Sequence, residues 1–203
     1  MTTRLEATTT IAAFTATGRI PQLREALNGA LDAGLTISEI KEILIQMYAY
    51  TGFPRSLNGL GAFMEVLATR RTNGIEDQPG TQPSPPPPGT DMLSLGTDNQ
   101  TKLVGAPVTG PLFEFAPTID QFLKSHLFGD IFARDNLDWQ TREVATVAAL
   151  SALDGLESQL RSHVGVALNT GVTEAELREV ASTLNTHVGE AAVARLNEVL
   201  ASR

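Results

Sequence analysis

The chain has 203 residues, of which 42% are hydrophobic, and its formal net charge is −8. A chain of this length can bury a core, and its acidic balance argues against nucleic acids and anionic membranes as partners, because both select clustered Lys and Arg. The absence of cysteine excludes disulfides, thiolate nucleophiles and cysteine-bound metals. The sequence has neither a signal-peptide pattern nor an apolar run of about 20 residues, so we expect a cytoplasmic protein.

The chain begins with two helical patterns. We expect a first helix over residues 5–17 and a second helix that starts near Pro21, because proline suits the first turn of a helix. Gly34 is placed to end the second helix in a left-handed cap. One face of this helix carries apolar residues at the i, i+3, i+4, i+7 and i+8 spacing of a buried stripe, namely Leu23, Ala26, Leu27, Ala30 and Leu31.

Two further helices are predicted in the first third of the chain. Thr36 and Glu39 have the spacing of a capping box, in which the hydroxyl and the carboxylate each satisfy a free backbone amide. This pattern predicts a third helix over about 37–50. Pro54 opens a fourth helix that extends to about residue 69.

Residues 76–91 differ in character from the rest of the chain. They include four consecutive prolines, Pro85–Pro88, which favour an extended polyproline segment over a helix or a central strand. We therefore interpret residues 76–116 as a Pro-rich linker followed by an irregular segment with at most one short helix. The linker would join a first unit over residues 1–75 to a second unit over residues 117–203.

The second unit also has a helical pattern throughout. An aromatic-rich helix is predicted from Pro117 to about Arg134, and Asp138 can cap the next helix. The stretch Val144–Leu153 is apolar on nearly every side, which is typical of a helix at the centre of a bundle. Further helices are expected over about 156–169, from 173 to 186 and over 190–200. No segment shows the alternation of a strand, so the predicted fold class is all-α.

The chain contains an internal duplication. Residues 6–52 align without a gap on residues 143–189 after a shift of 137 positions. This alignment matches Ala26 of the first copy with His163 of the second. A duplicated unit lets one copy keep chemistry while the other becomes scaffold, so positions that differ between the copies are candidates for function. Matched pairs include Glu6/Glu143, Gly18/Gly155, Gly34/Gly171, Thr36/Thr173, Glu39/Glu176 and Gly52/Gly189.

Motifs in both copies carry a resemblance to a known family. In the first copy they are Leu31–Thr36, Glu39–Ile43 and Tyr50–Pro54, and in the second copy Arg142-Glu143, Gln159–His163 and Gly171–Glu174. Together they resemble the carboxymuconolactone decarboxylase family over most of the chain outside residues 70–117. The resemblance implies a duplicated AhpD-like helical bundle that assembles into ring-shaped oligomers. For a two-copy chain, it implies a homotrimer that mimics a hexamer.

The resemblance also implies two possible chemistries, because function divides within this family. One branch, similar to the alkylhydroperoxidase AhpD, reduces peroxides with a Cys-x-x-Cys pair, but those positions here hold Leu156 and Gln159. Without cysteine this chain cannot act as a thiol peroxidase. The other branch, similar to the decarboxylase itself, handles small carboxylated lactones without a cofactor. We therefore expect a cofactor-free lyase that acts on a small carboxylated lactone or unsaturated acid.

His163 and Glu143 are the predicted catalytic residues. His163 lies in an apolar stripe, and imidazole is suited to moving protons near neutral pH. Glu143 lies on the preceding predicted helix, and the resemblance implies a Glu–His proton relay of the kind that the thiol branch of the family uses. The alternatives are a hydrogen-bonded core histidine and a carboxylate that stabilises the positive end of its helix. The second alternative is supported by Glu6, which occupies the matching place in the copy that lacks the histidine.

Four residues are predicted to bind substrate. Arg142 or Arg161 could hold a carboxylate in a bidentate fork, Gln159 is expected to face inward one turn before His163, and Tyr50 is expected to line a pocket. The alternative for Arg161 is a structural salt bridge, since Arg24 matches it in the first copy. The alternative for Gln159, which is matched by Gln22, is a structural role, and the alternative for Tyr50 is interface packing. The three histidines show no close spacing such as His-x-x-x-His, so we expect no metal site.

Two other functions remain open from the sequence. The first is a non-catalytic oligomeric scaffold with a decayed site, since one copy already carries Ala26 in place of the histidine. The second is a natural-product tailoring enzyme that uses the same proton-transfer residues on a larger substrate, with the aromatic helix over 117–134 as a wall of the pocket.

Overall fold

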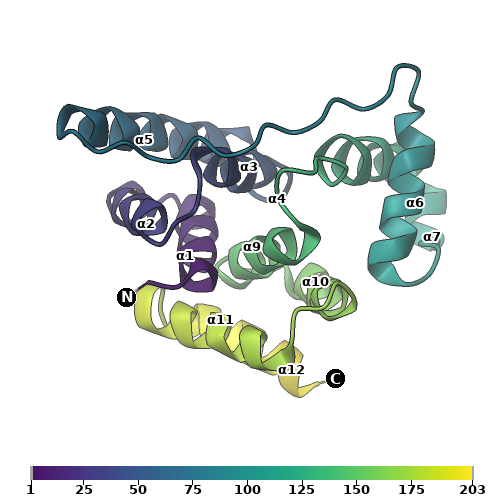
Figure 1. Ribbon diagram of the computed structural model, residues 1–203. Helices are drawn as coiled ribbons and strands as arrows, with labels where there is room; N and C mark the ends of the chain where they lie inside the picture. The colour runs from purple at the N-terminus through teal and green to yellow at the C-terminus, as the bar shows by residue number, and fades with distance from the viewer. Residues whose placement is uncertain (1, 203) are drawn as a thin grey trace.

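The computed structural model describes residues 2–202, and every regular element in that range is a helix (Figure 1). This confirms the predicted all-α class. No helix in the described range is long and apolar enough to cross a membrane. In chain order the elements are α1 (Arg4–Thr17), α2 (Ile20–Asp32), α3 (Ile37–Gln46), α4 (Tyr48–Thr51), α5 (Phe53–Thr72), α6 (Met92–Val104), α7 (Pro111–Phe115), α8 (Pro117–Phe122), the π-helix η1 (Leu123–Ile131), α9 (Trp139–Ser151), α10 (Glu157–Asn169), α11 (Glu174–His187) and α12 (Glu190–Ala201).

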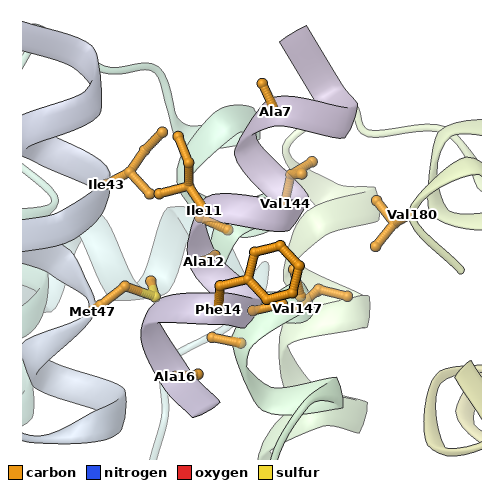
Figure 2. Close-up of a cluster of buried hydrophobic side chains, with 14 of the residues drawn as sticks. Ala7, Ile11, Ala12, Phe14, Ala16, Ile43, Met47, Val144, Val147 and Val180 are labelled. Atoms are coloured by element: carbon orange, nitrogen blue, oxygen red, sulfur yellow. The ribbon is translucent and has the colours of Figure 1, made fainter. Parts of the chain in front are cut away.

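Two helices, α1 and α9, pack against each other at the centre of the molecule, and the other helices of both units lie around them (Figure 1). Figure 2 shows Phe14 of α1 beside Val147 of α9, whereas Ile11 lies towards Ile43 of α3, on the side of α1 where Met47 also lies. The core is therefore shared between the two copies. As the sequence predicted, α9 is buried on nearly all sides.

Helix α1 is buried although it is rich in threonine. Thr8, Thr9, Thr10 and Thr15 are all buried, and the hydroxyl of each donates to a backbone carbonyl one turn earlier, at 2.7–2.9 Å. These bonds satisfy the polar atoms within the helix itself, so the threonine methyl groups are free to pack. A Thr-rich helix can thus occupy the centre of the core.

The predicted helix starts are present. Thr36 with Glu39, and Thr173 with Glu176, form complete capping boxes at the starts of α3 and α11. The side chain of Asp138 accepts a bond from the third amide of α9. Each cap satisfies backbone donors that the first turn of a helix leaves free.

The duplication is visible in the helix boundaries. Helices α2 and α10 begin and end at positions related by the shift of 137, and a glycine with positive φ follows each: Gly34 at 85° and Gly171 at 100°. The copies differ after α3, because the first copy breaks at Met47 into α3 and α4 whereas α11 continues to His187. The break places Tyr50 on a separate short helix.

The proline-rich segment is extended, as predicted, but it is packed against the first unit. It returns along α5 and passes the start of α3 before it reaches α6 (Figure 1). The amides of Ile37 and Ser38 donate to the carbonyls of Gln78 and Pro79 at 2.9 and 3.0 Å. These bonds satisfy the first two amides of α3 and fix the linker to that helix.

Residues 92–104, expected to be irregular or to hold one short helix, form the 13-residue helix α6. Asp91 caps the helix and Gly105 ends it. Its buried positions include Gly96, Asn99 and Gln100 as well as Leu103. The buried face is therefore only partly apolar, which explains why hydrophobic periodicity did not predict the helix.

The helix predicted from Pro117 to Arg134 forms in two parts, α8 followed by the π-helix η1. Helix η1 packs closely on α6: a Cβ atom on Gly96 would lie 1.6 Å from the Lys124 carbonyl oxygen, and Asn99 donates to the Phe128 carbonyl at 2.9 Å. The pair adds a second, smaller apolar cluster to the molecule. Its buried members are Leu103, Leu127, Phe128, Ile131, Phe132 and Val166.

Candidate active site

The structure brings His163 and Glu143 together. Glu143 projects from the central helix α9 and His163 from the neighbouring α10, and Nδ1 of His163 lies 2.8 Å from Oε2 of Glu143. The Glu143 side chain is completely buried, whereas 13% of the His163 side chain is exposed. The carboxylate is thus shielded from water while the imidazole can exchange protons with the outside. This arrangement suits a histidine whose orientation is set by a buried carboxylate.

Tyr50 of the first copy lies against this pair. Its ring meets the imidazole of His163 edge-on, with the ring centroids 5.3 Å apart and the planes at 84°. The Tyr50 hydroxyl and Oε1 of Glu143 are both buried, and neither has a hydrogen-bond partner among the described residues. Burial and the nearby charge of Glu143 raise the pKa of Tyr50 above its ordinary value. The phenol therefore stays protonated and can act as a hydrogen-bond donor.

Arg142 points away from the surface and binds the first copy. It is fully buried, and its guanidinium donates to Oε2 of Glu42 at 3.2 Å and to Oε1 of Gln46 at 3.1 Å. Further bonds go to the carbonyls of Leu137 and Arg134. Because each nitrogen of its guanidinium is bonded within the protein, the geometry favours a structural role for Arg142 over carboxylate binding.

Gln46 ties α3 to the segment of α9 that carries Glu143. Its amide nitrogen donates to the carbonyl of Arg142 at 2.9 Å and to the hydroxyl of Thr146 at 2.8 Å. The bonded residues lie directly before Glu143 and three residues after it. The first copy therefore holds the α9 turn from which the candidate catalytic carboxylate projects.

Glu42 is the acidic centre of this network. Its buried carboxylate accepts two bonds from Arg134, at 2.8 and 2.7 Å, in addition to the bond from Arg142. Burial alone raises the pKa of Glu42, but the hydrogen bonds and charges of the two arginines outweigh burial and hold the pKa below its ordinary value. Glu42 is thus ionised and compensates the buried charge of Arg142.

Arg161 and Gln159 lie on the solvent side of α10. Gln159 was expected to face inward, but it is exposed. Arg161 is also exposed and donates to the hydroxyl of Ser202 beyond α12. Its counterpart Arg24 pairs with Glu65 across the equivalent helices α2 and α5. This parallel favours the structural alternative for Arg161.

Comparison with known proteins identifies the family. The model of the carboxymuconolactone decarboxylase family matches residues 3–65 and 117–201, which include every residue of the candidate site. The chain belongs to the carboxymuconolactone decarboxylase family. It is also similar to the 4-carboxymuconolactone decarboxylase of Acinetobacter baylyi, with 36% identity over 69 residues, 34% of this chain and 51% of that protein. The chain thus spans about half the length of this relative.

This carboxymuconolactone decarboxylase family member also carries a counterpart of the site. The shift that matches Ala26 with His163 also matches Glu6 with Glu143 and His187 with Tyr50. Nε2 of His187 lies 3.2 Å from Oε1 of Glu6, but the two side chains are 39% and 29% exposed. Each site thus combines residues of both copies, and only the Glu143 site buries its carboxylate.

Sequence reasoning missed Glu42, Gln46 and Thr146 as parts of the site. A signal was present in the comparison of the copies, because Gln46 is matched by Thr183 and Arg142 by Leu5. This difference between the copies marked Gln46 and Arg142, whereas Glu42 and Thr146 are matched by Glu179 and Thr9 and gave no such signal. Among the described residues, no group of three or more His, Asp or Glu side chains is arranged to hold a metal ion.

Proposed function

We propose that this protein is a cofactor-free lyase that decarboxylates a small carboxylated lactone or unsaturated acid by proton transfer at His163. The observation that carries the proposal is the 2.8 Å contact between His163 Nδ1 and the buried Glu143 carboxylate. Membership of the carboxymuconolactone decarboxylase family supports it. The relative from A. baylyi supports 4-carboxymuconolactone as the first substrate to test.

His163 supplies the proton in the proposed reaction. The bond between the substrate and its carboxylate carbon breaks, CO2 leaves, and the electron pair of that bond delocalises into the unsaturated lactone as a dienolate. The protonated imidazole then transfers a proton to carbon, which gives the product lactone and neutral His163. A proton from solvent restores the imidazolium through the exposed part of the ring.

Glu143 orients the imidazole of His163. Its Oε2 faces Nδ1 of His163, so Nε2 is the nitrogen left to face a substrate. Glu143 thereby has the role that a buried carboxylate has beside a catalytic histidine in other acid–base sites.

Tyr50 donates to the oxygen on which negative charge develops. Its hydroxyl is buried and protonated, and its ring contacts His163. A buried donor of this kind stabilises an enolate-like oxygen more effectively than water does. Arg142 has a positioning role here, together with Glu42 and Gln46, and Arg161 and Gln159 take no part.

The test is turnover of 4-carboxymuconolactone by purified protein, followed as CO2 release. We expect the wild-type protein to turn over the substrate. His163→Ala should lower kcat about 1,000-fold or more because it removes the proton donor, and Glu143→Gln should lower kcat to a similar extent because it removes the group that orients the donor. Circular dichroism checks that the variants fold. Unchanged turnover in a folded His163→Ala variant would overturn the proposal.

A non-catalytic scaffold is the second candidate function, favoured by Ala26 at the position that matches His163. A scaffold with a decayed site would bind no substrate. Thermal shift measurements with a panel of small carboxylic acids and lactones separate the two functions. A shift that His163→Ala abolishes supports the enzyme, and no shift with any compound supports the scaffold.

We also propose that the protein assembles into a homotrimer. Several large apolar side chains are exposed in the single chain, and they lie on α5 and on the α7–α8 segment. Such patches mark interaction surfaces. The exposed residues are Phe53, Leu57, Met64, Leu112, Phe115, Ile119 and Phe122.

Light scattering tests this assembly. The measured mass should be three times the chain mass of 21.7 kDa, and Met64→Glu on α5 should lower the measured mass of the assembly.

A further inference from the structure

A cavity of about 860 Å³ lies between the proline-rich segment and the second unit. Its walls come from residues 83–87, from α6, from the end of η1, from the segment that joins η1 to α9, and from Trp139 at the start of α9. None of His163, Glu143 and Tyr50 lines it. Its volume lies in the range of small-molecule sites, about 300–1,000 Å³.

The cavity has an apolar wall that is already in place. Phe132 is buried, and Trp139 is held by a 2.8 Å bond from its indole nitrogen to the Phe132 carbonyl. Met92 and Leu95 of α6 complete this side, and the exposed proline rings of residues 85–87 form the opposite side. Proline and a fixed indole lose little conformational freedom when a ligand binds. The walls therefore suit an apolar or aromatic body.

The charged groups at the cavity are mainly acidic. Asp130, Asp135 and Asp138 line it, against one cation, Arg134. The Arg134 guanidinium is bonded to Glu42, a carboxylate that it shares with the buried Arg142. Asp130 lies 2.6 Å from Nδ1 of His126, and the three aspartates still outnumber the one cation that lines the cavity. Bonds from Ser84 hold the pKa of Asp135 below its ordinary value, so this carboxylate is charged. The opening therefore favours a cation and disfavours an anion.

We propose that this cavity binds a small amphipathic cation, an organic amine with an aromatic or aliphatic body, independently of the His163 site. The body lies against Trp139, Phe132 and the prolines, and the ammonium group faces the aspartates. The bond from the Ser84 amide to Asp135 Oδ1, at 2.8 Å, holds the proline-rich segment over the cavity.

Trp139 gives a direct readout, because it is the only tryptophan in the chain. The probes are 4-phenylbutylamine, the neutral 4-phenylbutanol and the anionic 4-phenylbutyrate, which share one body and differ in the head group. We expect the amine to change Trp139 fluorescence in a saturable way and to shift the indole N–H signal in a ¹H–¹⁵N spectrum. We expect the butyrate to bind at least about tenfold more weakly than the amine.

The variant that tests the charge interaction is Asp135→Asn/Asp138→Asn. It removes two negative charges, while each asparagine keeps a hydrogen-bond acceptor and the one at position 138 keeps the helix cap. It should bind the amine about fivefold more weakly and the alcohol as well as wild type does. Equal binding of the three probes, tighter binding of the butyrate, or amine binding that leaves the Trp139 signal unmoved would each overturn the proposal. Because wild-type decarboxylase turnover does not enter this test, failure here is distinct from failure of the proposed function.

Discussion

Glu42 of the first copy and Arg142 of the second form a buried ion pair, with Oε2 and Nη2 3.2 Å apart. Arg142 directly precedes Glu143, so this contact joins the scaffold of one copy to the candidate catalytic residue of the other. The duplicated halves are therefore interdependent at the site.

Loss of Glu42 should destabilise the protein strongly. Glu42→Gln leaves the buried charge of Arg142 without its carboxylate, which we expect to lower the free energy of unfolding by about 3 kcal/mol. Urea denaturation followed by circular dichroism measures this change. The matched control is Glu174→Gln, which removes the exposed pair with Arg178 and should cause no measurable loss. Equal effects of the two substitutions would show that the Glu42 network is not a stabilising contact between the copies.

Stability should also depend on pH through Glu42. Its pKa in the folded protein lies below the ordinary value of 4.5, so the unfolded chain binds more protons in mild acid. The contribution of Glu42 is then present above that ordinary value and is lost as the pH falls through the folded-state pKa. The urea midpoint of wild type should fall more steeply between about pH 5 and about pH 3 than that of Glu42→Gln. Parallel curves for the two proteins would contradict this assignment.

Tyr50→Phe should slow decarboxylation without changing its pH dependence. Removing the buried donor should lower kcat about 100-fold. Because the pKa of Tyr50 is raised, the phenol stays protonated and the ratio of variant to wild-type rate should be constant from about pH 6 to about pH 9. Stability should change little, since the hydroxyl has no bond to lose among the described residues. A ratio that varies with pH would show that Tyr50 titrates and is not a simple donor.

Gly96→Ala should disrupt the packing of α6 on η1. The added methyl would lie 1.6 Å from the Lys124 carbonyl oxygen, and we expect a loss of about 3 kcal/mol in the free energy of unfolding. Gly61→Ala on α5 is the matched control, because a Cβ atom there meets nothing within 4 Å. That substitution should stabilise the helix by about 0.5–1 kcal/mol. If Gly96→Ala were as stable as Gly61→Ala, the close crossing of α6 and η1 would be wrong.

Sequence patterns predicted the elements whose local signals and apolar stripes agree. The capping boxes at Thr36 and Thr173 and the cap at Asp138 set helix starts that the structure confirms. Helix α6 was missed because it packs through Gly96 and Asn99, and the π-helical turns of η1 have no known signature in the sequence. Local pattern is therefore sufficient only where the packing is apolar and regular.

Only part of the candidate site could be predicted from the sequence. His163 and Glu143 stood out because the copies differ at Ala26 and because the family resemblance implied a Glu–His pair. The environment of Arg142 and Gln159 could not be predicted, since it depends on how α3 and α10 are rotated in the bundle. That rotation brings Gln46 onto α9 and turns Gln159 to the solvent.

The most direct test of the central claim is a double-mutant cycle on kcat/KM with His163→Ala, Glu143→Gln and the combined variant. If the two residues act as one proton-transfer unit, the combined variant should be no slower than the slower single variant, because either change already removes the unit. If the two losses multiply, or if His163→Ala turns over substrate at the wild-type rate, the proposed mechanism is wrong.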